Sequence, residues 1–241
     1  MKSYLGYFRL SVLWALIATL GWLFFLQAPE TTFAQSSADG LPVIIVSWSA
    51  PTYTPIGYEG KALPVFDSRV AVSADVFLGE NFIDPSSILY RWSVDGLILA
   101  AGKGVKKMSF PVRSGPNAPL FVRLELEMLG KAYEKATYIQ NAQPKLSLRE
   151  PYGGGKISGT PRPFIALPFF FSVVESNELE YSWKLGSSPA AAESQRPDKI
   201  LIGARAGTPL NASFPLALEV KNPKSFGEIV SKNIMLRVFN P

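Results

Sequence analysis

An internal repeat with a period near 92 residues constrains the fold of this chain more than any other feature. Tyr90-Arg-Trp92 in the first half returns as Tyr181-Ser-Trp183 in the second half. Two more blocks return at an offset of 92 residues: Arg113-Ser-Gly115 as Arg205-Ala-Gly207, and Leu124-Glu-Leu126-Glu127 as Leu216-Ala-Leu218-Glu219. Three blocks at nearly one offset indicate that the chain contains two copies of one unit.

Alternating apolar residues indicate that each unit is built from β-strands. The stretch 70–76 alternates valine or alanine with polar or small residues, which is typical of a half-buried strand. With 20 prolines and 19 glycines, the composition favours short strands joined by turns over a helical bundle. A unit of this length with a tryptophan on a central strand predicts an all-β fold of two tandem immunoglobulin-like β-sandwiches, at residues 40–142 and 143–241.

The pattern also places the individual strands. In the first unit we expect strands at 43–48, 69–77, 87–94, 97–101, 106–112, 120–129 and 132–139. In the second unit we expect them at 145–149, 163–174, 178–185, 198–204, 211–220 and 228–239. The run from Ile165 to Val174 is almost wholly apolar, which predicts a central strand buried on both faces. Pro168 within that run indicates a bulge or a switch between sheets.

The repeated aromatic pair has two interpretations. Trp92 and Trp183 match the tryptophan that packs between the sheets of an immunoglobulin-like domain. Tyr90 and Tyr181 share the same strand face, so we expect all four side chains to form structural core. The alternative is that the tryptophans are exposed platforms for sugar rings.

The N-terminus has the features expected of an export signal. Lys2 and Arg9 precede a run without charge, residues 10–26, which predicts that residues 1–34 are a signal peptide or a membrane anchor. Small residues before Gln35 offer a cleavage site after Ala34. Both fates remain open: a mature protein in the periplasm or at the cell surface, or one anchored to the inner membrane by this segment.

The missing residue types exclude most enzyme mechanisms. The chain has no cysteine and no histidine, which removes the usual general base, the thiolate nucleophile and the commonest zinc ligands. A glycosidase with two carboxylates remains conceivable, but we expect a non-enzymatic protein without cofactor or metal. The net charge is +5, and the densest basic spot, Lys103 with Lys106 and Lys107, lacks the stripe that nucleic acid needs.

Several carboxylates fall near the expected ends of the second and third strands of the first unit. They are Asp67, Asp75, Glu80, Asp84 and Asp95. One interpretation is a calcium ion near Asp84, because hard cations take several oxygen ligands. The other is a set of solvated loop acids, because the D-x-D-x-D-G spacing of a calcium loop is missing.

Aromatic residues and prolines alternate between Trp48 and Pro64. Trp48, Tyr53, Tyr58 and Lys61 form a candidate partner-binding loop, in which an extended segment presents aromatic side chains. The alternative is a first strand that crosses between sheets, with its aromatic side chains covering the end of the sandwich, because prolines occur where a strand leaves a sheet.

This segment carries a family resemblance. Residues 48–55 (WSAPTYTP) and 58–64 (YEGKALP), with the strand Tyr90–Gly96 and the turn Gly102-Lys-Gly104, resemble exported proteins of candidate-phylum (patescibacterial) genomes with tandem immunoglobulin-like or PKD-like domains. The likeness covers most of residues 43–240. That family has no assigned activity, so the resemblance implies location and architecture only. The Gly-Lys-Gly order departs slightly from the family's turn.

A broader likeness is to PKD-type modules. The stretch from Asp84 to Trp92 is similar to their tryptophan strand, but Val94-Asp95-Gly96 stands where those modules carry an acidic turn. The departure weakens the likeness to this subfamily and leaves the sandwich unaffected.

Together these features predict an extracytoplasmic interaction or structural protein of the cell envelope. Its tandem domains would bind a protein or an envelope polymer, with no nucleic-acid partner and with membrane contact only if residues 1–34 are retained. Two alternatives stay open. One is a periplasmic chaperone of the pilus-assembly type, which donates a strand edge; the other is a carbohydrate-binding module.

Overall fold

The computed structural model describes residues 41–240. Regular structure in this part is β-strand, apart from two 3₁₀ turns, η1 (Pro85–Ser87) and η2 (Ser176–Glu178). The predicted signal peptide or anchor, residues 1–34, lies outside the described residues. Between residues 41 and 240 there is no helix with the length and apolar character that crossing a membrane requires.

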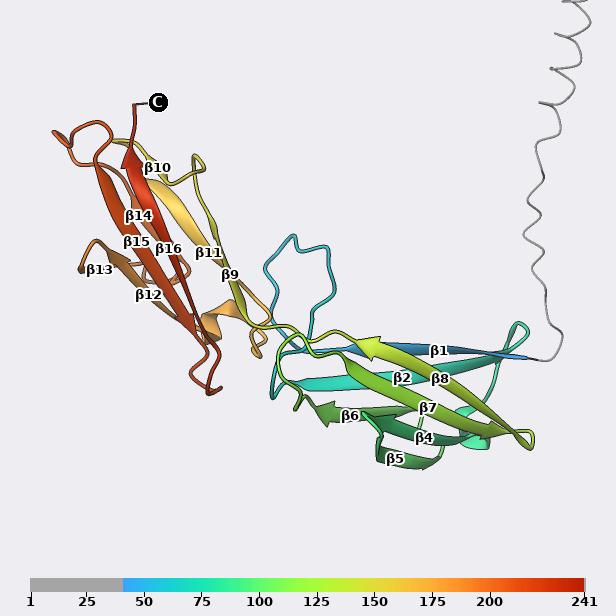
Figure 1. Cartoon of the computed structure of the whole chain (residues 1–241). Helices are drawn as coiled ribbons and strands as arrows, with labels where there is room; N and C mark the ends of the chain where they lie inside the picture. Colours follow the sequence, from blue (N-terminus) through green and yellow to red (C-terminus); the bar gives the residue numbers. More distant parts are fainter. Residues whose placement is uncertain (1–40, 241) are drawn as a thin grey trace, which may run out of the picture. The chain divides into compact units, whose positions relative to one another are not determined.

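Eight strands between residues 42 and 139 form the first sandwich, coloured blue to yellow-green in Figure 1. In one sheet β2 pairs with β1 along one side and with both β3 and β6 along the other. The other sheet has the order β5-β4-β7-β8. The strands are β1 (Pro42–Ser49), β2 (Arg69–Leu78), β3 (Asn81–Phe82), β4 (Leu89–Val94), β5 (Leu97–Lys103), β6 (Lys107–Pro111), β7 (Leu120–Met128) and β8 (Lys131–Ile139).

Eight further strands between residues 145 and 238 form the second sandwich, coloured yellow to red in Figure 1. Its sheets have the orders β14-β11-β9 and β10-β16-β15-β12-β13. The strands are β9 (Lys145–Arg149), β10 (Lys156–Ile157), β11 (Arg162–Phe169), β12 (Glu180–Leu185), β13 (Ser188–Ala190), β14 (Lys199–Ile202), β15 (Ser213–Lys221) and β16 (Ile229–Val238). The predicted all-β fold of two immunoglobulin-like sandwiches is confirmed.

The tryptophan strands hold equivalent places in the two sandwiches. Trp92 on β4 is 0% exposed and Trp183 on β12 is 3% exposed. The Trp92 indole N–H donates to the carbonyl of Val105 at 2.8 Å, and that of Trp183 donates to the carbonyl of Pro197 at 2.9 Å. Residues 105 and 197 are again 92 positions apart, so the repeat in the sequence is also a repeat of this hydrogen bond.

The tyrosines of the repeat differ from each other. Tyr90 is fully buried, whereas Tyr181 is half-buried and donates its hydroxyl to the carbonyl of Ser176 at 3.1 Å. Burial raises the pKa of both phenols, because a low-dielectric surrounding disfavours the phenolate.

Buried side chains separate into two large clusters and one small one. The first cluster joins the sheets of the first sandwich and the second joins those of the second. The third consists of Val65, Ala142 and Phe170 and therefore contains residues from both sandwiches. The described residues from Pro42 onward form one compact unit, and the exact domain boundaries at 142 and 143 stay a prediction.

One strand prediction was wrong in its length and burial. We expected a strand over 163–174 that is buried on both faces, but β11 ends at Phe169. Its buried residues alternate with half-buried ones, and Pro168 lies opposite Leu146 in an unbroken ladder, without a bulge. The strand ends because Phe170 takes a left-handed backbone angle, φ 61°, which turns the chain toward the loop after β1.

Candidate functional site

The loop after β1 contacts the second sandwich. The N–H of Tyr53 donates to the carbonyl of Phe171 at 2.8 Å, and the N–H of Phe170 donates to the carbonyl of Tyr53 at 2.7 Å. These bonds form an isolated antiparallel bridge. The ring of Tyr53 packs against the second hydrophobic cluster. Because the bridge consists of backbone hydrogen bonds, it fixes the path of this loop independently of the neighbouring side chains.

The other three residues of the predicted binding loop also contact the chain itself. The ring of Tyr58 lies edge-on to those of Phe169 and Phe170, with centroids 5.7 and 5.8 Å apart. Trp48 is half-buried against the first cluster. The ammonium of Lys61 lies 3.7 Å from the centroid of the Trp48 ring, a cation–π contact. These contacts join the loop to both sandwiches, and a role for the four residues in partner binding stays a prediction.

A groove of about 470 Å³ lies next to the third cluster. Its lining is mostly apolar and comes from Val65, Phe66, Pro116, Ala142, Pro144 and Phe226, among others. Two of these rings face solvent: Phe66 is 52% exposed, and Phe226 is fully exposed. Exposed phenyl rings beside an apolar groove are a feature of interaction sites, because water solvates them poorly.

A tight turn presents Phe66. The N–H of Ser68 donates to the carbonyl of Val65 at 3.0 Å, which closes the turn around Phe66 and Asp67. The buried hydroxyl of Ser68 also accepts the N–H of Val65 and donates to its carbonyl. Asp67 has φ 65°, and its carboxylate pairs with Arg113 at 2.6 Å. The position of Phe66 is therefore set by hydrogen bonds of its own turn.

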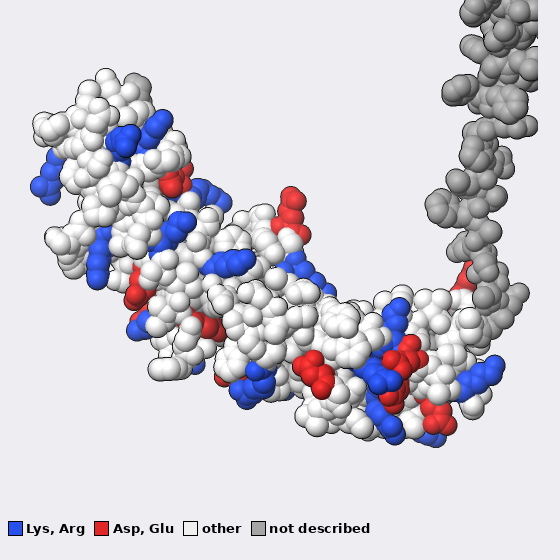
Figure 2. Space-filling model, in the orientation of Figure 1, with Lys and Arg blue, Asp and Glu red and all other residues white. Residues whose placement is uncertain are grey.

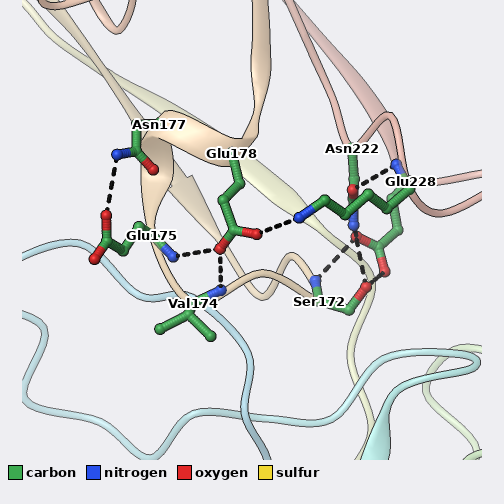
Figure 3. Close-up of polar contacts among 8 residues, drawn as sticks. Ser172, Val174, Glu175, Asn177, Glu178, Asn222 and Glu228 are labelled. Carbon is green, nitrogen blue, oxygen red and sulfur yellow. Dashed lines mark hydrogen bonds and ion pairs between the residues drawn. The ribbon is translucent and has the colours of Figure 1, made fainter.

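The turn between β15 and β16 presents Phe226, and a buried carboxylate holds it. Glu228 is 4% exposed and accepts hydrogen bonds from the N–H and hydroxyl of Ser172 and from the side-chain amide of Asn222 (Figure 3). Asn222 in turn accepts the N–H of Lys224 at 3.0 Å through its side-chain oxygen. Phe226 thus lies on a turn that is held by hydrogen bonds within the turn and by those from Ser172.

A second carboxylate fixes the same turn to η2. Glu178 accepts the N–H groups of Val174 and Glu175 and pairs with the ammonium of Lys224 at 2.7 Å (Figure 3). The hydrogen bond from Lys224, followed by those from the two backbone N–H groups, lowers the pKa of Glu178 to about 2. The carboxylate is therefore ionised at any physiological pH.

Three more of the acids singled out in the sequence have structural partners. Asp84 caps η1, accepting the N–H and hydroxyl of Ser86, and these bonds lower its pKa. Asp75 pairs with Lys106 at 2.9 Å, and Asp95 accepts the N–H of Phe121 at 2.9 Å. In the described part of the chain no three acidic side chains come together as cation ligands would. The calcium interpretation near Asp84 stays a prediction.

Charge on the surface is mixed. On the face drawn in Figure 2, basic and acidic side chains lie interspersed among uncharged ones. Arg123, for example, contacts both Glu125 and Glu134 across the outer face of the β7–β8 pair. On the face drawn, interspersed charge would attract neither anionic polymers nor nucleic acid strongly.

Sequence reasoning did not single out Phe66, Phe226 or Glu228. A signal for Phe226 was present: an aromatic residue in the short polar stretch Asn222–Gly227, between two strands, is unusual for a turn. Phe66 lies just past the predicted binding loop. Glu228 carried no signal, because only the folded chain brings it to Ser172.

Comparison with known proteins adds fold-level likeness only. No protein-family model matches the sequence, and no curated protein matches it. The three N-terminal domains of the Highly Immunogenic Outer Capsid protein (Hoc) of bacteriophage RB49 are 14% identical, with a TM-score of 0.49 over 82% of this chain and 59% of that one. Immunoglobulin domains 1–5 of Sidekick-1 are 12% identical, with a TM-score of 0.31 over 83% of this chain and 39% of that one.

A third similar structure is a glycan-binding one. SGBP-B from the mixed-linkage glucan utilization locus of Bacteroides ovatus, in complex with a mixed-linkage heptasaccharide, is 13% identical, with a TM-score of 0.24 over 83% of this chain and 47% of that one. This chain thus spans between about two fifths and three fifths of these three structures. At such scores the likeness carries no argument about a partner.

Proposed function

We propose that this chain is an extracytoplasmic binding protein without catalytic activity, whose groove beside Phe66 and Phe226 takes an apolar segment of a protein partner. One observation carries the proposal: two exposed phenyl rings stand on preformed turns at the rim of an apolar groove. Burying a phenylalanine side chain contributes about 1.5–3 kcal/mol. Because the turns are already ordered, binding loses little conformational entropy there.

The chemistry of the groove favours a polypeptide over a sugar. A sugar site presents coplanar aromatic faces with many polar groups, whereas this lining is dominated by phenylalanine, proline, valine and alanine side chains. Trp92 and Trp183, the sequence candidates for a sugar platform, are buried. An envelope polymer is therefore the alternative ligand, and the crosslinking experiment described below distinguishes it from a protein.

The proposal also includes the location of the protein outside the cytoplasm and its lack of catalytic activity. The apolar run at residues 10–26 supports export, with residues 1–34 as a cleaved leader or an anchor to the inner membrane. The resemblance to exported patescibacterial proteins supports it too. A chain without cysteine or histidine lacks the side chains that most hydrolases and metalloenzymes use. We place the protein in the periplasm or at the cell surface.

Photocrosslinking in the cells that make the protein tests the proposed site. A benzophenone amino acid replaces Phe226 in the full chain, and adducts are analysed by mass spectrometry. We expect one dominant protein adduct. The matched control carries the same probe at Leu129, which is also exposed, at the tip of the β7–β8 hairpin, and we expect no dominant adduct there. Phe66→Ser should reduce the Phe226 adduct about tenfold, because a tenfold change corresponds to about 1.4 kcal/mol, less than a buried phenyl ring contributes.

The outcomes separate the alternatives. Equal labelling at positions 226 and 129 would contradict the groove as a binding site. A glycan adduct at position 226 would overturn the protein partner in favour of an envelope polymer.

A further inference from the structure

Basic side chains collect at the end of the second sandwich where β16 finishes. Backbone hydrogen bonds join the three segments that form this end, residues 150–162, 203–212 and 236–240. The basic side chains on these segments are Lys156, Arg162, Arg205 and Arg237. All four are exposed, and none makes an ion pair within residues 41–240. The same segments contain one acid, Glu150, so this basic end carries an excess of positive charge.

Contacts within the basic end place its cations beside two aromatic rings. Lys156 lies opposite Arg237 in the parallel pair of β10 and β16. The ammonium of Lys156 lies 5.9 Å from the centroid of the Phe239 ring, which is edge-on to the ring of Tyr152 at 4.9 Å. A nearby serine hydroxyl and then the guanidinium of Arg162 lower the pKa of the Tyr152 phenol, because both stabilise the phenolate. The cations therefore lie together rather than scattered over the sandwich.

The first sandwich gives an internal comparison, because Arg113 and Arg205 are equivalent residues of the repeat. The residue before each arginine donates its N–H to the carbonyl of a serine, Ser68 in the first sandwich and Ser158 in the second. Directly before Ser68 stands Asp67, which pairs with Arg113 at 2.6 Å. Neither neighbour of Ser158 in the sequence is acidic. The second sandwich thus has the repeated arginine without the acid that neutralises it in the first.

An exposed leucine indicates what kind of anionic partner fits the basic end. Leu210, in the segment 203–212, is 63% exposed. Basic side chains attract the headgroups of anionic lipids, and each one near such a surface raises the binding constant about fivefold. An apolar side chain among them gains further by entering the boundary between headgroups and acyl chains. A water-soluble polyanion offers the leucine no such apolar region, so the combination favours a membrane surface.

We propose that the basic end binds the surface of a membrane that contains anionic lipids, with Leu210 entering the headgroup boundary. The four cations supply the attraction, and the leucine supplies the apolar contact. This contact does not require residues 1–34. None of the residues of the basic end lines the groove beside Phe66 and Phe226, so this proposal and the proposed function can fail separately.

A fluorescent probe at the leucine tests the contact, because the chain has no cysteine of its own. The full chain with Leu210→Cys is labelled with an environment-sensitive nitrobenzoxadiazole dye and held in phosphatidylcholine nanodiscs, which cover the apolar run at residues 10–26. Vesicles of phosphatidylglycerol and phosphatidylcholine in equal parts are then added. We expect the fluorescence to rise at least about twofold, because the dye leaves water for the lipid boundary.

The matched control carries the same dye at Val174→Cys. Val174 is also exposed, and it follows the opposite end of β11 from Arg162, so we expect no rise there. Equal responses at positions 210 and 174 would overturn the proposal. Vesicles of phosphatidylcholine alone should give no rise at position 210, and an equal rise with them would show that anionic lipid is not what is recognised. A rise as large with soluble polyphosphate would overturn the membrane in favour of an anionic polymer.

Charge reversal tests the part played by the cations. Lys156→Glu together with Arg237→Glu, in the Leu210→Cys background, should abolish the rise, because two attractions become repulsions. Lys103→Glu with Lys107→Glu is the control: it changes net charge equally, at two exposed lysines of the first sandwich, and should leave the rise unchanged. Equal effects of the two double variants would contradict a role for the basic end.

Salt provides a measurement that does not depend on how the charge variants fold. Raising the KCl concentration from about 0.05 to 0.5 M shortens the screening length, so the rise at position 210 should be lost without any change of charge in the protein. A rise that persists at high salt would contradict binding through the four cations.

Discussion

At the scale of single residues, one indole connects the two sheets of each sandwich. Trp92 stands on β4, and its acceptor Val105 precedes β6 of the facing sheet. Trp183 stands on β12, and its acceptor Pro197 precedes β14 of the facing sheet. Each ring therefore fills the core and also satisfies a carbonyl that would otherwise lack a partner. Because the arrangement is the same twice, replacing either ring should have a similar effect.

Replacement of each tryptophan tests this equivalence. We expect Trp92→Phe and Trp183→Phe each to lower the free energy of unfolding by about 2–4 kcal/mol, because each change loses a hydrogen bond, orphans a buried carbonyl and leaves a cavity. Urea unfolding followed by circular dichroism measures the effect. Tyr138→Phe, at an exposed ring, is the control and should change less than about 0.5 kcal/mol. A loss that small at Trp183 would contradict the shared role.

At the scale of elements, the period-2 pattern of apolar residues predicts the long strands well. β2, β7 and β8 begin and end within one residue of their expected positions. β3, β10 and β13 have only two or three residues, too few for a period to show. The end of β11 was missed because local preference and tertiary contact disagree: phenylalanine favours strands, yet the bridge to Tyr53 requires a turn at Phe170.

The candidate site was predictable in part for the same reason. The aromatic loop Trp48–Pro64 stood out in the sequence, but which surface its rings contact depends on Phe169 and Phe170, more than 100 residues later. The groove depends on two turns, at Phe66 and Phe226, that only the folded chain places along one groove. Long-range juxtaposition leaves no local pattern, so these features could not be read from the sequence.

The η2 turn yields a prediction about pH. The folded-state pKa of Glu178, about 2, lies below its ordinary value of 4.5. The stability from this carboxylate is therefore fully present above pH 4.5 and is lost as the pH falls toward 2. We expect the difference in free energy of unfolding between wild type and Glu178→Gln to shrink over that range. Urea titrations at several pH values measure it.

Glu219→Gln serves as the control for this titration, because Glu219 is an exposed acid on β15. The Glu178→Gln difference should shrink by more than the Glu219→Gln difference as the pH falls from 4.5 to 2. Equal changes for the two variants would contradict the low pKa of Glu178.

At the scale of the whole molecule, the third cluster determines whether the two sandwiches unfold together. This cluster, formed by Val65, Ala142 and Phe170, is separate from the two large clusters. The ring of Phe170 also contacts that of Tyr58. A buried phenylalanine at such a place contributes several kcal/mol, which is comparable with the stability of one sandwich of this size. We therefore expect the described part of the wild-type chain to unfold in one cooperative transition.

Phe170→Ala should separate the two sandwiches thermally. Removing the ring weakens the coupling between them, although the backbone bridge of Tyr53 remains. A difference of about 2 kcal/mol in their remaining stabilities then corresponds to Tm values roughly 10 °C apart for domains of this size. Differential scanning calorimetry should then show two peaks instead of one. Phe121→Ala is the matched control, because Phe121 packs on Tyr138 at 5.0 Å within the first sandwich; it should lower stability without splitting the peak. One peak for Phe170→Ala would contradict coupling through the third cluster, because the ring would then be dispensable for joint unfolding.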